Sequence, residues 1–427
     1  MSRADFARSV LLLVAMPLAT FADGIDENHI VPFDHPAIDY MKGKVDDPIT
    51  RLRARVSKGE VELRYENNGF GYLRSVLAAL GVPPESQMLV FSKTSFQRTH
   101  IAPETPRSIF FADDVAVGFV QHGDMLEFAA LDPRQGTRFY TLHNSPSAAP
   151  RFASNGLTCV QCHDSTPTLG VPGAFVRSVV PDRLGEPISA APAYIIDQTS
   201  PIENRWGGWY VTGSTGPVRH LGNAIAESQS MPNMLTRHPT LEDLTGVIDT
   251  SRYLEPTSDV VALMTLEHQA RLWDLLTRVG WDARIAAADH KPFDDAEVED
   301  LLGYMLFSKE AKLLAPVVAS SDFAKTFEKR GPRDRHGRSL RDFDLQKRLF
   351  KYPLSYMVYS EAFDALPETV LARFYGRLYE ILSGDDMSGA YARLTPEDRK
   401  AIFEILLDTK KTLPAYFRIG EDASPSG

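Results

Sequence analysis

The only two cysteines of this 427-residue chain lie three positions apart, as Cys159 and Cys162, and His163 follows directly. Cys-x-x-Cys-His is the attachment motif for c-type haem, in which each thiol adds to one vinyl group of the porphyrin. The adjacent imidazole then meets the iron as its fifth ligand. The motif therefore predicts one covalently bound haem c, with His163 as the proximal iron ligand.

Two other interpretations of the paired cysteines stay open. A redox dithiol usually opens a helix after a strand in a βαβ unit. Here the residues on both sides of the motif are rich in Pro, Gly, Ser and Thr, which indicates loops around at most a short helical turn. A zinc site would need a fourth ligand and usually a second closely spaced pair. Both alternatives are therefore less favoured than haem attachment.

The ligand on the far side of the iron would decide between an electron carrier and a haem enzyme, because a second strong ligand closes the metal to chemistry. His220 is one candidate, since it lies in a Gly-rich loop after a predicted strand. Met264 and His268 are alternatives that share one predicted helical face, although such residues are usually part of a core. Weaker candidates are Met231, Met234 and His143.

Aromatic and basic residues of the same region could contact the porphyrin. Paired glycines lie between Trp206 and Trp209, so the backbone could approach the ring while an indole covers its edge. A tight hairpin that fills the core explains the same residues equally well. Arginines that could pair with haem propionates are Arg151, Arg177, Arg205 and Arg219. Arg205 and Trp206 are the predicted haem contacts.

Residues 1–22 have the organisation of a secretory signal peptide. Two arginines precede an apolar run over residues 10–21, and the small residue Ala22 ends the segment. The run is short for a membrane span and contains Pro17. We therefore expect cleavage after Ala22, a periplasmic or otherwise exported protein, and no stable membrane insertion afterwards. Haem is attached covalently outside the cytoplasm in bacteria, so the segment agrees with the attachment motif.

The overall composition is that of a globular protein, with 43% hydrophobic and 24% charged residues. The net charge of −10 argues against nucleic acid as a partner and allows a basic or neutral redox protein. Residues 325–348 form a locally basic stretch that could dock an acidic partner. A solvated loop is the favoured interpretation of that stretch.

Hydrophobic periodicity predicts an α+β fold that differs from the small all-α cytochrome c fold. Short alternating runs between residues 88 and 142 predict a β meander, and the strand pattern continues through RWGGWYVTG. Helices are predicted at 73–80, at 258–279, where Asp259 suits the positive dipole end of the first turn, and after the N-terminal cap Thr395. The predicted divisions are an N-terminal helical segment at 23–85, a β-rich haem c region at 86–230, a helical lobe at 231–420 and a polar tail at 421–427.

Several segments resemble a large family of exported mono-haem c-type cytochrome proteins from environmental bacteria. They include SKTSFQRTHIAPETPRSIFFADDVAVGFV, TCVQCHDS, RWGGWYVTG and DVVALMTLEHQ. The resemblance spans nearly all of the mature chain. It implies haem attachment, electron transfer and an iron ligand at His163, and it implies no substrate.

Two functions are therefore expected. The first is a periplasmic electron carrier that passes single electrons from one haem c to an unidentified redox partner protein. The alternative is a peroxidase-like haem oxidoreductase with an open sixth iron position, in which His220 or Glu267 acts as acid or base. Dihaem peroxidases need two attachment motifs, and this chain has one, which favours the electron carrier.

Overall fold

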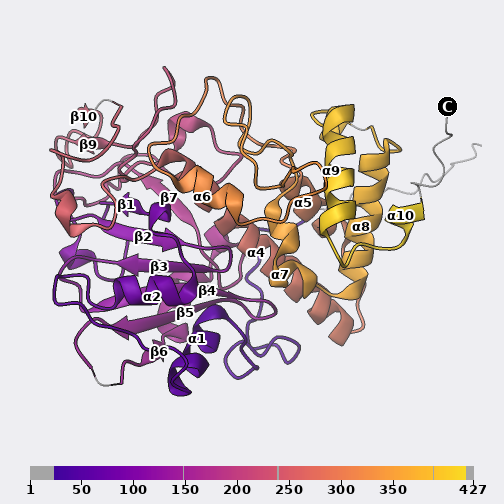
Figure 1. Cartoon of the computed structure of the whole chain (residues 1–427), viewed down its shortest axis with the longest axis horizontal. Helices are drawn as coiled ribbons and strands as arrows, with labels where there is room; N and C mark the ends of the chain where they lie inside the picture. The colour runs from indigo at the N-terminus through magenta and orange to yellow at the C-terminus, as the bar shows by residue number, and fades with distance from the viewer. Residues whose placement is uncertain (1–23, 148, 238–239, 388, 420–427) are drawn as a thin grey trace, which may run out of the picture.

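The computed structural model describes residues 24–147, 149–237, 240–387 and 389–419. The predicted signal peptide and the tail at 421–427 lie outside the described residues. A β-rich part precedes a helical part along the chain, as the α+β prediction requires (Figure 1). No helix among the described residues is long and apolar enough to cross a membrane.

A six-stranded antiparallel sheet forms the centre of the β-rich part. Its strands follow one another in sequence order, so each pairs with the next, and the predicted meander is confirmed. The strands are β1 (Met88–Val90), β2 (Arg107–Phe111), β3 (Val115–Phe119), β4 (Met125–Asp132), β5 (Gly136–His143) and β6 (Phe152–Ser154).

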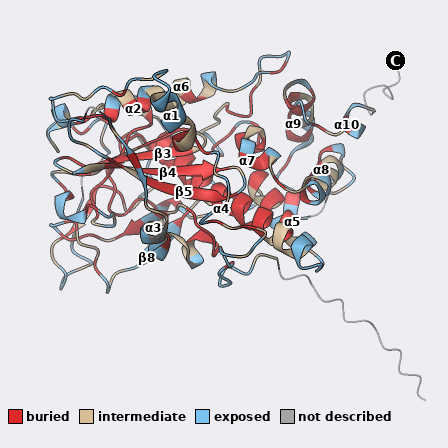
Figure 2. Ribbon diagram, turned by 90° about the horizontal axis from the view of Figure 1, so that it is seen from below, coloured by how far each residue is buried: buried red, intermediate tan, exposed pale blue. Residues whose placement is uncertain are grey.

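The two faces of this sheet are covered differently. Leu126, Phe128 and Ala130 alternate along β4 and are buried in a core with α1 (Pro48–Ser57) and α2 (Leu73–Leu80). On the other face, the β4 residues up to Ala129 are half-buried, whereas Leu131 is buried in the main core. Figure 2 shows α1 and α2 on one side of β3, β4 and β5, and α3 and β8 on the other. We call the half-buried part of this second face the open face.

The open face is bordered by three elements, which are α3 (Gly156–His163) and the antiparallel pair β7 (Val176–Val179) and β8 (Ala193–Ile196). A second small hairpin consists of β9 (Ala224–Ala226) and β10 (Leu235–Arg237).

A helix of 29 residues, α4 (Val260–Ala288), connects the two parts of the molecule (Figure 1). It contacts β5 and β7 on one side and the C-terminal helices on the other. Nearly all residues of α4 from Val260 to Trp281 are buried, whereas the sequence predicted a single apolar stripe. More than one side of the helix is buried because α4 packs against both the sheet and the C-terminal helices.

The remaining helices follow α4 along the chain. They are α5 (Asp295–Met305), α6 (Phe323–Lys329), α7 (Glu361–Asp364), α8 (Glu368–Ser383), α9 (Pro396–Thr409) and α10 (Tyr416–Ile419). Among them, α5, α6, α7 and α8 contact α4, and α9 packs against α8. Short 3-10 helices lie at Pro84–Ser86, Arg98–His100, Thr166–Thr168, Ile202–Asn204, Thr250–Arg252, Tyr356–Tyr359 and Gly389–Tyr391. The predicted cap of α9 is confirmed, since the Thr395 side chain accepts a hydrogen bond from the backbone N–H of Asp398.

Two predicted elements differ from the structure. The helical part begins at Val260 rather than at residue 231, because β10, a 3-10 turn and loops fill the interval. The RWGGWYVTG segment is not a sheet strand. It lies along β1 through a bridge from Val90 to Trp209 and a hydrogen bond from Tyr210 N to Leu89 O, and positive φ angles at Trp206 and Gly208 interrupt any longer ladder.

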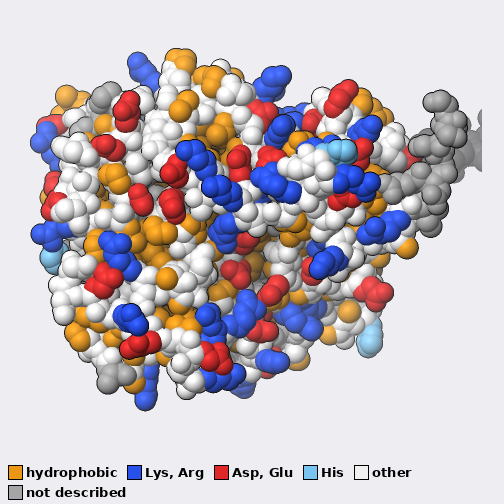
Figure 3. All heavy atoms as spheres, in the orientation of Figure 1, with side chains coloured by type: hydrophobic (Ala, Val, Ile, Leu, Met, Phe, Trp, Pro, Cys, Tyr) orange, Lys and Arg blue, Asp and Glu red, His pale blue; other side chains and the backbone are white. Residues whose placement is uncertain are grey.

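The basic stretch at 325–348 is held in ion pairs with carboxylates. On the face that carries α1, α2 and α6, lysines and arginines alternate with acidic side chains (Figure 3). This favours the interpretation of a solvated, internally paired surface over a docking surface. The pairs are Arg333–Asp342, Arg335–Asp408, Arg338–Glu404, Arg341–Asp113 and Arg348–Asp398.

Asp259 is expected to be a major contributor to stability. It is fully buried, caps α4 through the N–H groups of Val261 and Ala262, and also accepts four hydrogen bonds from Ser320 and Ser321. Asp259→Ala should lower the free energy of unfolding by about 3 kcal/mol, because a cap is lost and buried donors are left unpaired. The matched control is Asp294→Ala, which removes the one-bond cap of α5 and should cost about 1 kcal/mol. Equal losses in urea titrations would contradict this account.

Candidate functional site

The Cys-x-x-Cys-His motif occupies most of α3. Val160 anchors this helix, because its side chain is buried in a small core with Tyr40 and Trp281. Cys159 is half-buried and Cys162 is exposed, and residues three apart lie on the same side of a helix. Two thiols one turn apart are thus presented together.

The surroundings of α3 differ from the loops that the sequence predicted. The edge strand β6 ends just before α3, and α3 has eight residues rather than a single turn. A strand followed by a helix is the context expected of a redox dithiol. However, β6 pairs antiparallel with β5 at the edge of the sheet, so it does not belong to a βαβ unit.

The ionisation of Cys159 weighs against a redox dithiol. Burial, together with the nearby Glu127 and Cys162, raises the pKa of Cys159 to about 11. A redox dithiol needs a thiolate, which a lowered thiol pKa favours and a raised one disfavours. Among the described residues, no group of three or more His, Cys, Asp or Glu side chains is arranged to hold a metal ion.

The imidazole of His163 is held in one tautomer. Its ring lies between those of Phe139 and Phe175, with centroids 4.8 and 5.5 Å away. Nδ1 is 2.9 Å from the carbonyl oxygen of Gly173, and a carbonyl can only accept. Nδ1 therefore carries the hydrogen, and Nε2 keeps its lone pair. Burial lowers the pKa of His163, so the ring is neutral, which is the form that ligates metals.

A single peptide group links His163 to the central helix. Gly173 C=O accepts the hydrogen bond from His163, and the N–H of the same peptide, at Ala174, donates to Asp274 Oδ1 over 3.0 Å. Asp274 lies on α4 and is fully buried. A Cβ at Gly173 would collide with the Asp274 carboxyl, so the arrangement requires glycine there. Hydrogen bonds in such a chain polarise one another.

An ion pair crosses the open face of the sheet near this histidine. Arg107 Nη2 on β2 lies 2.6 Å from Glu127 Oε2 on β4. The guanidinium passes over Gly118 of β3, where any Cβ would collide with it. Both charges are close enough to His163 to act on its pKa, which Arg107 lowers and Glu127 raises.

This part of the second face contains two buried polar atoms without a hydrogen-bond partner. Arg107 Nε and Glu127 Oε1 are buried and have no partner within the protein. The neighbouring residues on the same face are half-buried and pack against the main core. They are Ile109, Ala116 and Ala129.

The structure does not bring His220 together with His163. The His220 ring contacts Trp206 at 5.1 Å, while the ring neighbours of His163 are Phe139 and Phe175. Burial lowers the pKa of His220 to about 4, and Nδ1 is buried without a partner. His220 is thus a neutral histidine in a separate cluster.

His268 and Met264 belong to the core rather than to an iron site. His268 is fully buried; its Nδ1 is 2.5 Å from Gln198 Oε1 and its Nε2 is 2.7 Å from Ser355 Oγ. Both ring nitrogens are therefore occupied, and burial lowers the ring pKa to about 3. Met264 is buried in the main core. The hypothesis of a sixth ligand at either position is not supported.

Arg205 and Trp206 contact a carboxylate of α4 instead of an open pocket. Arg205 Nη1 donates to Glu267 Oε2 over 2.8 Å, and Trp206 Nε1 donates to Glu267 Oε1. All three side chains are buried, and burial raises the pKa of Glu267 to about 7. This network holds the RWGG loop against α4. It favours the interpretation that the aromatic cluster fills the core.

The other sequence candidates lie on the surface. Met231 and Met234 flank the turn between β9 and β10, and His143 ends β5. The exposed arginines of the predicted propionate set are Arg151, Arg177 and Arg219. Sequence reasoning missed the residues that surround His163, because nothing in their local pattern marks them. These are Arg107, Glu127, Phe139, Gly173, Phe175 and Asp274.

No protein-family model, curated protein or solved structure matches this chain. Function must therefore be argued from the site itself.

The two thiols should differ in reactivity before any haem is attached. In a chain expressed without residues 1–22 in the cytoplasm, iodoacetamide should alkylate Cys162 at least tenfold faster than Cys159 at pH 8. The reason is that Cys162 is exposed, while Cys159 is half-buried and its raised pKa of about 11 leaves little thiolate. Peptide mass spectrometry over time measures both rates. In urea the rates should converge, and equal rates in the folded chain would contradict the described environment.

Proposed function

We propose that the protein is an exported c-type cytochrome that carries one haem c and transfers single electrons. The porphyrin is attached through Cys159 and Cys162, and His163 is its proximal iron ligand. The observation that carries the proposal is the tautomer of His163, whose Nδ1 hydrogen bond to Gly173 leaves Nε2 as the ligating atom beside two thiols. Ligating histidines characteristically donate their other N–H in this way.

The chain contributes orientation and electrostatics to the bound group. A haem supplies a one-electron iron couple whose potential depends on its ligands and their hydrogen bonds. The peptide bridge from Asp274 fixes the plane of the His163 ring, and Phe139 and Phe175 hold its faces. The spare donor of Arg107 suits a propionate oxygen.

Electron transfer is preferred to a peroxidase-like reaction. The two acid–base candidates from the sequence lie in other environments, since Glu267 is bound by Arg205 and Trp206 and His220 packs on Trp206. The proposal includes export through the segment 1–22, function in the periplasm and an unidentified redox partner protein. The proposal includes neither a nucleic-acid partner nor a membrane-spanning segment.

Replacement of His163 tests the ligand directly. His163→Gly should retain covalent haem but change its Soret and visible bands, and imidazole added during growth and purification should restore the bands of the unsubstituted protein by filling the vacated position. The matched control is His143→Gly, at the exposed end of β5, which should leave the spectrum unchanged. An unaltered spectrum in His163→Gly would refute this histidine as the ligand.

Asp274 should tune the iron through the shared peptide. Asp274→Leu removes the acceptor for Ala174 N–H, which weakens the hydrogen bond at His163 and its electron donation to the ferric ion. If the hydrogen bond at His163 stabilises the ferric state over the ferrous state by about 1 kcal/mol, its loss raises the midpoint potential by roughly 40 mV. Asp274→Asn keeps an oxygen acceptor for Ala174 N–H and should shift the midpoint potential much less. Identical potentials for all three proteins in spectroelectrochemical titration would exclude the bridge.

A further inference from the structure

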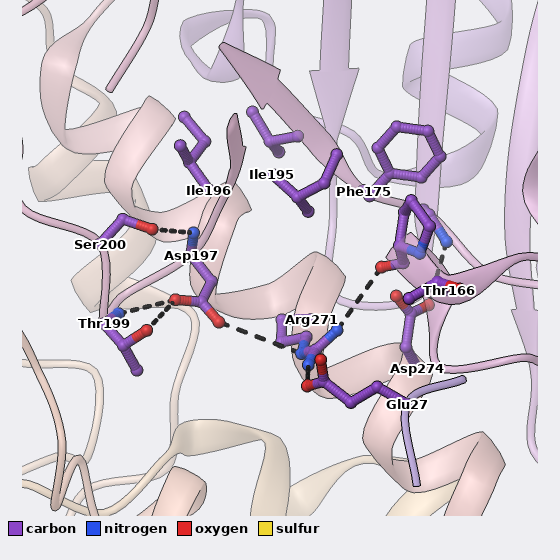
Figure 4. Close-up of a pocket in the computed structure, with 13 residues that line it drawn as sticks. Glu27, Thr166, Phe175, Ile195, Ile196, Asp197, Thr199, Ser200, Arg271 and Asp274 are labelled. Atoms are coloured by element: carbon purple, nitrogen blue, oxygen red, sulfur yellow. Dashed lines mark hydrogen bonds and ion pairs between the residues drawn. The ribbon is translucent and has the colours of Figure 1, made fainter. Parts of the chain in front are cut away.

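A cavity of about 250 Å³ lies next to the attachment motif, between β7, β8 and α4 (Figure 4). One side of it is apolar. The side chains of Phe175, Ile195 and Ile196 form this wall, and Ile195 is 40% exposed at the entrance. A water molecule occupies about 30 Å³ of liquid, so the cavity has room for a ligand of several heavy atoms.

The opposite side of the cavity contains a carboxyl oxygen without a partner. Asp274 lines the cavity and is fully buried; its Oδ1 accepts from Ala174 N, but its Oδ2 has no hydrogen bond. An unpaired buried polar atom costs roughly 1–3 kcal/mol and needs an explanation, of which a bound ligand is one. The collision that any Cβ at Gly173 would cause shows that the backbone makes room for this carboxyl.

The charges around the cavity favour a cation. Arg271 Nη2 is 2.5 Å from Glu27 Oε1, and its Nε is 4.0 Å from Asp197 Oδ2, as Figure 4 shows. The lining therefore has three carboxyl groups and one arginine, which is already paired. An anionic ligand would face the carboxylates of Glu27 and Asp197, and the one arginine of the lining is already paired. An ammonium group would instead supply the hydrogen-bond donor that Asp274 Oδ2 lacks.

We propose that this cavity binds a small primary ammonium compound. The ammonium group donates to Asp274 Oδ2, and the hydrocarbon part lies against Phe175, Ile195 and Ile196. Buried carboxyl groups favour the neutral form, and burial indeed raises the pKa of Asp274 well above its usual range. The ligand ionises Asp274 by supplying the positive charge that the site lacks. The site does not depend on the presence of haem.

Calorimetric titration of the mature protein tests this site with three probes of one shape. n-Butylammonium should bind saturably with one site per chain, at least tenfold more tightly than 1-butanol, and butyrate should not bind. Asp274→Asn should weaken n-butylammonium at least tenfold and leave 1-butanol unchanged. The control Glu242→Gln, at an exposed position, should change neither the affinity for n-butylammonium nor that for 1-butanol.

A second variant guards against a folding defect in Asp274→Asn. Ile195→Trp places a large side chain at the partly exposed entrance and should block n-butylammonium without a change in circular dichroism. Equal binding of the three probes, binding of none of them, or full affinity in both variants would overturn the proposal. The measured heat requires no iron, so a colourless protein that binds n-butylammonium would refute the cytochrome and leave this site standing.

Discussion

The peptide group between Gly173 and Ala174 connects the predicted iron ligand to the centre of the fold. Its carbonyl fixes the tautomer of His163, and its N–H is held by Asp274 on α4. Because α4 is buried on nearly every side and capped by Asp259, Asp274 occupies a position that can hardly move. The orientation of a histidine on a half-exposed, eight-residue helix thus depends on a long and almost completely buried helix.

The two faces of the sheet are covered differently. One face is fully covered by α1 and α2 and forms a conventional core. The other carries small, half-buried residues and the Arg107–Glu127 pair, whose spare buried atoms are a stability cost that a bound group would offset. Glycine at position 118 is what allows the arginine to cross the strand between them. The His163 ring contacts Phe139 of β5 and Phe175, which directly precedes β7.

Local patterns predicted the elements well, and long-range contacts remained hidden. The helix at Leu73–Leu80, the cap at Thr395 and the strand meander depend on residues close in sequence, so periodicity and capping signals identify them. Asp274, however, follows His163 by 111 residues, and only the packing of α4 brings it to Gly173. The same limit explains His268, whose partners Gln198 and Ser355 come from distant loops and convert a candidate ligand into a core residue.

The most direct test of the central claim is the intact mass of the mature protein from a host that attaches haem c, together with its pyridine haemochrome spectrum. The account predicts a chain without residues 1–22 that is heavier by one haem, resistant to acid–acetone extraction, with a spectrum typical of two thioether bonds. A colourless chain with Cys159 and Cys162 as free thiols would contradict it.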